Sequence, residues 1–107
     1  MSQLEISIAR DFSETPAGRH TKDSATSGER FREEVLAPAL RKAEEVVIDL
    51  DGTLGYGSSF LEEAFGGLVR QGFTPEQLHQ RMQIKSSTPT YLRRVWQYIE
   101  EEGKRSK

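Results

Sequence analysis

Two aspartates separated by one residue are the side chains of this 107-residue sequence whose types and spacing most directly suggest chemistry. Asp49 and Asp51 follow the short apolar run 46–48, which is typical of a buried strand, so both would lie where that strand ends. Paired carboxylates can bind a hard cation such as Mg²⁺, but one pair without further oxygen ligands seldom holds the ion in place. Asp51 and Gly52 are also residue types that end a strand in a turn. The pair therefore has a catalytic and a structural interpretation.

The run Asp49-Leu50-Asp51-Gly52-Thr53-Leu54 resembles the nucleophile motif of the haloacid-dehalogenase superfamily of phosphatases. The resemblance implies that Asp49 attacks phosphorus, that Asp51 is the general acid and base, and that Mg²⁺ bridges them to the phosphoryl oxygens. Those enzymes also need a hydroxyl residue, a lysine and a downstream pair of acids. After the motif the sequence offers a lysine and a serine at 85–86, whereas the acids at 100–102 fall in a helical tail. We favour the structural interpretation and keep a small Mg²⁺-dependent phosphatase as the alternative.

A second chemical feature is the serine pair Ser58-Ser59 at the beginning of a predicted helix. The preceding turn contains three glycines, and the apolar residues after the pair recur at four-residue spacing. Serine is a preferred helix N-cap, so either residue could simply begin the helix. Either hydroxyl could instead carry a phosphate, which the free N–H groups and the positive end of a helix stabilise. Both interpretations remain open at this point.

The surrounding elements alternate between strands and helices, which is typical of an α/β layer. Ser27 is expected to cap the first long helix, and Pro38 to kink or shorten it. The loop that precedes this helix holds at most a short strand near 19–22. The predicted elements are a strand over about 3–9, a loop over 13–27, a helix over 28–44, a central strand covered on both faces over 46–50, a helix over 58–71, a short helix opened by Thr74-Pro75, a strand over 83–86, and a helix from Pro89 that frays from Glu100.

The resemblance that covers most of the chain is to the STAS domain, the fold of anti-sigma-factor antagonists. In the run Val46–Leu68 an apolar strand, a short loop and a serine pair lead into a helix. It implies an α/β fold with about four strands in a small mixed sheet and helices packed against it. The chain length independently favours a single domain over residues 1–107. More closely, the sequence resembles the STAS-like family of bacterial proteins through Gly18-Arg19, Asp23, Ser27-Gly28, Phe31-Arg32 and the run 55–67.

The same resemblance implies a regulatory protein-binding module and not an enzyme. In the parent family a histidine-kinase-like ATPase phosphorylates the serine at the helix start, and only the unphosphorylated domain captures that partner. Here Ser58 would be the acceptor and Ser59 its neighbour, although the acids of the first helical turn would oppose a phosphate beside them. A structural module within a larger assembly is a third possibility, indifferent to both serines. The expected contacts with such an ATPase or anti-sigma factor are Arg19, Tyr56, Gly57, Ser58, Ser59, Glu62 and Glu63, with the loop 19–27.

Composition argues against several other functional classes. Without cysteine the chain has no disulfide, thiolate-bound metal or cysteine nucleophile, and it fits a reducing compartment such as the cytoplasm. Lys+Arg 15 against Asp+Glu 17 gives a net charge of −2, which supplies no basic surface for nucleic acid. No apolar run approaches the length of a membrane span, and the N-terminus lacks the pattern of a signal peptide. His20 and His79 are far apart in the sequence, so we expect no metal site and no cofactor.

Overall fold

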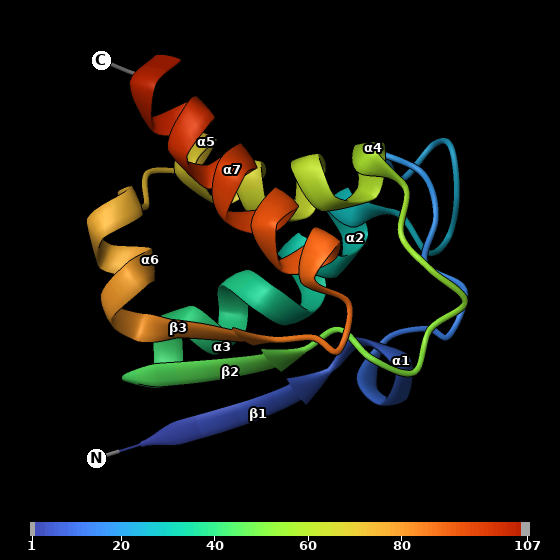
Figure 1. Ribbon diagram of the computed structural model, residues 1–107, viewed down its shortest axis with the longest axis horizontal. Helices are drawn as coiled ribbons and strands as arrows, with labels where there is room; N and C mark the ends of the chain where they lie inside the picture. The colour runs from blue at the N-terminus through green and yellow to red at the C-terminus, as the bar shows by residue number, and fades with distance from the viewer. Residues whose placement is uncertain (1, 106–107) are drawn as a thin grey trace.

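Three parallel strands form the sheet in the computed structural model, which describes residues 2–105 (Figure 1). They are β1 (Gln3–Ser7), β2 (Glu45–Asp49) and β3 (Met82–Lys85), and β2 lies between the other two. The central position predicted for the apolar run is confirmed. The expectation of about four strands in a mixed sheet is wrong, because the sheet has three strands and all are parallel.

The stretch 19–22 forms no strand because its backbone bonds to the start of a helix instead. The carbonyls of Gly18 and Arg19 accept hydrogen bonds from the N–H groups of Gly28 and Glu29, each at 3.0 Å. His20 then begins a turn that is closed by its own carbonyl and the N–H of Asp23. The loop before the first long helix is therefore anchored to that helix.

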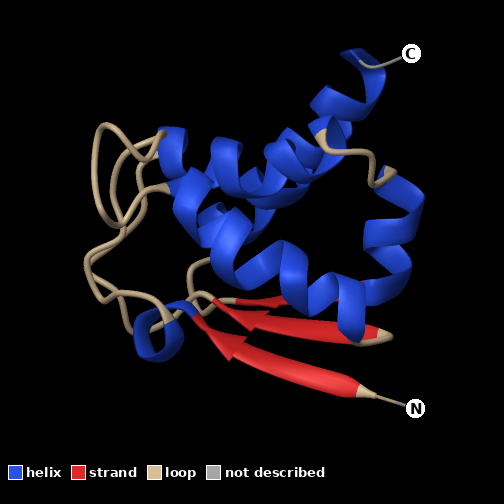
Figure 2. Cartoon of the chain, turned by 180° about the vertical axis from the view of Figure 1, so that it is seen from behind, coloured by secondary structure: helices blue, strands red, loops and turns tan. Residues whose placement is uncertain are grey.

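The helices that follow residue 27 cover one face of the sheet, as the two opposite views show, whereas a short helical turn over residues 8–11 lies at the end of β1 (Figures 1 and 2). Leu4, Val46 and Met82 form one row across the strands on this face, and three isoleucines form the next. On the other face Val47 is only 5% exposed, and charged side chains of β1, β3 and the stretch 8–11 line the small hollow beside it. The prediction that the central strand is covered on both faces is confirmed for its middle residues, because Val46, Val47 and Ile48 are all buried. Side chains of opposite character alternate only on its neighbours β1 and β3.

The first long helix runs without a break over residues 28–42 and includes one π-helical turn. It consists of α2 (Gly28–Phe31), η1 (Arg32–Leu36) and α3 (Ala37–Lys42). Ser27 caps it as predicted, since its hydroxyl accepts a hydrogen bond from the N–H of Arg30 at 3.1 Å. Pro38 does not end the helix. The wider π turn immediately precedes the proline, which cannot donate a backbone hydrogen bond.

The second long helix covers residues 58–70 as α4 (Ser58–Leu61), η2 (Glu62–Gly66) and α5 (Gly67–Arg70). Gly72 follows it with a φ of 119°, a left-handed conformation that suits the end of a helix. The predicted capping box at Thr74 is present before α6 (Pro75–Arg81). These boundaries agree with the sequence prediction to within a few residues.

The two ends of the chain differ from the prediction. After β1 the chain forms the short helix α1 (Ile8–Asp11), in which the Ser7 hydroxyl accepts a hydrogen bond from the N–H of Arg10. The alternating apolar pattern continues into Ile8 and hides this break. The last helix, α7 (Pro89–Arg105), stays regular past Glu100, because Glu102 is only 6% exposed and forms an ion pair within the fold.

Candidate functional site

Ser58 and Ser59 are the first two residues of α4, and both are exposed. The helix N-cap is Gly57, whose φ and ψ are extended, and no side chain makes a capping hydrogen bond there. The interpretation of either serine as the N-cap is therefore wrong. Both hydroxyls lie at the positive end of a 13-residue helix and are accessible for modification or contact.

Tyr56 anchors the loop between β2 and α4 through two hydrogen bonds. Its hydroxyl donates a hydrogen bond to the Leu50 carbonyl at 2.7 Å, and its N–H donates to the Tyr91 hydroxyl at 3.3 Å. Burial raises the pKa of Tyr56 to about 12. Tyr56, predicted as a partner contact, thus has a buried side chain that orients the loop. On the outer side of the same loop, Leu54 is 87% exposed, and its N–H donates to the Glu14 carbonyl.

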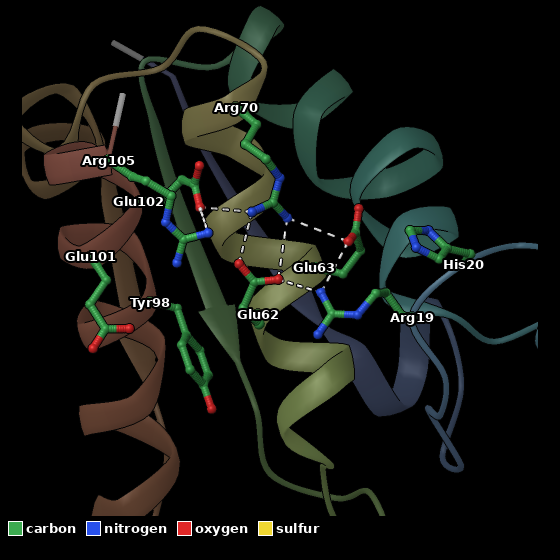
Figure 3. A pocket seen from close by; sticks show the side chains of 9 residues that line it. All are labelled: Arg19, His20, Glu62, Glu63, Arg70, Tyr98, Glu101, Glu102 and Arg105. Atoms are coloured by element: carbon green, nitrogen blue, oxygen red, sulfur yellow. Dashed lines mark hydrogen bonds and ion pairs between the residues drawn. The ribbon is translucent and has the colours of Figure 1, made fainter. Parts of the chain in front are cut away.

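One helical turn beyond the serines, Glu62 and Glu63 join a group of arginines (Figure 3). Arg70 donates to a carboxylate oxygen of Glu62 at 2.8 Å and to Glu63 at 3.4 Å. Arg19, from the loop 13–27, bonds to Glu62 and lies 3.3 Å from Glu63. Two further residues complete what we call the arginine–glutamate cluster. It consists of Arg19, Arg32, Glu62, Glu63, Arg70 and Glu102.

The cluster contains three residues predicted from the sequence to share one surface, and three that were not predicted. Arg19 lies against Glu62 and Glu63, although 43 and 44 positions separate them in the chain. Arg32, Arg70 and Glu102 were not predicted as site residues. The sequence signal is weak, because Arg70 is about two helical turns from the acids and Glu102 lies in a charged tail.

The arginines change the electrostatics of the site. Burial opposes ionisation of Glu62, but hydrogen bonds from Arg70 and Arg19 outweigh it and hold its pKa below the ordinary value. The same hydrogen bonds to Glu62 raise the pKa values of Arg19 and Arg70. Both acids are thus neutralised by neighbouring cations, and their charge no longer argues against a phosphate on the preceding turn.

Two consecutive glycines leave the space that the cluster occupies. A Cβ atom on Gly67 would lie 2.0 Å from Nη1 of Arg32, and one on Gly66 would lie 2.8 Å from Oε2 of Glu62. Gly28 has a similar role, since its Cβ would lie 2.5 Å from the Phe60 carbonyl oxygen. In the sequence, glycines inside the predicted helices are the signal that neighbouring groups pack closely against the backbone there.

A groove of about 450 Å³ opens beside the cluster, between the loop 13–27, the second long helix and α7. Arginine and glutamate side chains line both of its walls, and Tyr98 lies at its side (Figure 3). The charged lining suits polar recognition and not the burial of an apolar ligand.

The two aspartates of the phosphatase-like motif make hydrogen bonds that shape the end of the sheet. The Asp51 carboxylate accepts from the N–H of Ser87 at 2.9 Å and from its hydroxyl at 3.0 Å, which ties the turn after β2 to the loop after β3. Asp49 accepts from the N–H of Asp51 at 2.9 Å. Within residues 2–105 no three histidine, aspartate or glutamate side chains are grouped as metal ligands would be.

A family model described as a STAS-like domain of unknown function (DUF4325) matches residues 27–92. The match includes the serine pair, both consecutive glycines and four residues of the cluster, whereas Arg19 and Glu102 lie outside it. No curated protein and no solved structure matches the chain. In the part of the chain from 2 to 105, no helix combines the length and the apolar character that crossing a bilayer requires.

Proposed function

The chain belongs to the DUF4325 family of STAS-like domains, and from this membership we propose that it is a regulatory protein-binding module of the anti-sigma-factor-antagonist kind. Its partner is a histidine-kinase-like ATPase or an anti-sigma factor, and phosphorylation of the serine pair switches binding off. The observation that carries the proposal is the exposed pair Ser58-Ser59 at the beginning of a long helix, with neither hydroxyl used for capping.

The modification requires a kinase and a nucleoside triphosphate. A serine Oγ attacks the γ-phosphorus of ATP, a base on the kinase takes the hydroxyl proton, and ADP leaves with the electrons of the broken bond. The product carries a charge of roughly −2. The helix start stabilises this charge within the domain.

The partner surface consists of Leu54, Gly57, Ser58 and Ser59, and Arg19 lies at its edge. Leu54 supports this assignment because a large apolar side chain that is almost fully exposed contributes nothing to the core. On a partner it can fill an apolar pocket, which is where binding energy concentrates in protein interfaces. A phosphate four or five positions away would have to be desolvated when that pocket closes, so it would weaken the complex.

A pull-down from the native host tests the proposal, with the wild-type chain, Ser58→Glu, Ser59→Glu and Leu54→Asp as baits. We expect the wild type to retain an ATPase of the histidine-kinase-like fold or an anti-sigma factor. Leu54→Asp and at least one glutamate variant should retain at least ten-fold less of it. The matched variants Ser58→Ala and Ser59→Ala should bind as the wild type does.

The other outcomes separate the alternatives. Recovery of a partner that is indifferent to both serines would favour a structural module and would overturn the switch. Recovery of no ATPase and no regulatory protein would overturn the proposed partner class.

A further inference from the structure

Arg19 is held in a fixed position although it lies in a long loop. Gly18 has a φ of 91°, and the Gly18 and Arg19 carbonyls are bonded to the N–H groups that begin α2. A Cβ atom on Gly28 at that point would overlap the Phe60 carbonyl, so the start of α2 packs directly on the helix that carries the serines. The loop therefore presents the Arg19 guanidinium to the first turns of this helix.

Glu62 and Glu63 would each keep another arginine partner if Arg19 were removed. Glu62 keeps Arg70 at 2.8 Å, and Glu63 keeps Arg32 at 2.9 Å, if Arg19 moves away. The Arg19 side chain is 37% exposed, against 8% for Arg32. Its hydrogen bonds to both acids use Nη1, so Nε and Nη2 remain for another acceptor. An arginine of this kind can change partners without leaving a buried charge unpaired.

Helix spacing places Ser59 closer than Ser58 to the two acids that Arg19 binds. Side chains three and four residues apart on a helix are neighbours, and Ser59 precedes Glu62 by three residues and Glu63 by four. Ser58 has this relation to Glu62 alone. In Figure 3 Glu62 and Glu63 each contact Arg19 as well as Arg70.

We infer that Arg19 binds the phosphate when Ser59 is phosphorylated, and that it binds a phosphate on Ser58 less well. The inference rests on the proposed serine switch. Arginine pairs with phosphate through two parallel N–H donors, and its free Nε and Nη2 provide such a pair. Arg19 is a positioning residue, because it orients a phosphate that the kinase has already transferred from ATP.

The test uses the full chain with phosphoserine incorporated during synthesis at position 59, so that neither kinase nor partner is needed. The measurement is the second pKa of the phosphate, followed by ³¹P NMR. In free phosphoserine this second pKa is about 6. We expect Arg19 to lower it by about 1 unit relative to the Arg19→Gln variant, because an adjacent cation favours the dianion.

Arg105→Gln is the matched control, since it removes the same charge from the rim of the same groove, where Arg105 lies 3.7 Å from Glu102. It should leave the titration as in the wild type, and phosphoserine at position 58 should depend less on Arg19. Equal titrations in wild type and Arg19→Gln, or an equal effect of Arg105→Gln, would overturn the inference. A failure of the proposed switch would appear only in the partner pull-down and would leave this titration unchanged.

Discussion

Arg32 Nη1 lies 2.9 Å from a carboxylate oxygen of Glu63 and 2.5 Å from the main-chain carbonyl of the same residue. Both side chains are about nine-tenths buried. Each residue belongs to a π-helical turn, Arg32 to η1 and Glu63 to η2, so the pair joins the two long helices where both widen. Such turns are frequent at functional sites.

Removing one member of this pair should be costly. We expect Arg32→Met to lower the free energy of unfolding by about 3 kcal/mol, because Glu63 then loses its most buried partner. The measurement is urea unfolding at pH 7. The double variant Arg32→Met/Glu63→Leu removes both charges, so it should lose less stability than the sum of the single changes. It also removes the buried Arg32 Nε, which has no hydrogen-bond partner among the described residues. Arg105→Met, at an exposed position, should cost under about 0.5 kcal/mol, and an equal loss there would contradict the prediction.

The space beside Gly67 should be just as sensitive. In Gly67→Ala the new methyl group would overlap Arg32, so we expect a loss of about 2 kcal/mol in urea unfolding despite the better helix propensity of alanine. The control is Gly57→Ala, where a Cβ atom would meet nothing and only the weaker N-cap is at stake. The prediction fails if Gly67→Ala is as stable as the wild type.

Stability should fall in acid partly through Glu62. Its pKa in the folded chain lies below the ordinary value of 4.5, so its stabilising contribution is complete above pH 4.5 and is lost as the pH falls through the folded pKa. Between pH 7 and about pH 3.5 the wild type should therefore lose more stability than Glu62→Gln, as measured by urea unfolding at both pH values. Glu76→Gln, an exposed acid, should follow the wild type. Identical pH profiles for wild type and Glu62→Gln would refute the assignment.

The aspartates after β2 should matter for the fold and not for turnover. Asp51→Ala leaves the N–H and hydroxyl of Ser87 without their acceptor, so we expect a loss of about 1–2 kcal/mol. With Mg²⁺ and a generic phosphomonoester, neither the wild type nor Asp49→Asn should release phosphate. Hydrolysis by the wild type that Asp49→Asn abolishes would instead establish the phosphatase alternative.

The order of elements could be predicted from the sequence because each has a local signal. The apolar run of β2, the Ser27 cap, the Thr74 capping box and the proline that begins α7 depend on residues close together in the chain. The number and direction of strands could not be predicted in this way. Strand pairing joins residues such as Gln3 and Glu45, which are 42 positions apart, and alternation of apolar residues carries no information on direction.

The candidate site was predictable only in part. The serine pair and its neighbours follow from one continuous run of sequence. The arginines that neutralise Glu62 and Glu63 come from three separate segments, and charged residues in isolation are more often solvated than paired. Their grouping becomes visible only when the helices are packed.

The all-parallel sheet also constrains how the chain folds. Parallel strands cannot be joined by a short hairpin, so each pairing closes a long segment of chain that contains a helix. The two long helices, by contrast, can form from contacts within each segment. Because closing long segments costs entropy before it yields contacts, we expect helical structure to precede strand pairing and folding to be slower than that of a helical bundle of this size. Of the three strands β1 is synthesised first and pairs only with β2, so its pairing has to wait until residues 45–49 have been made.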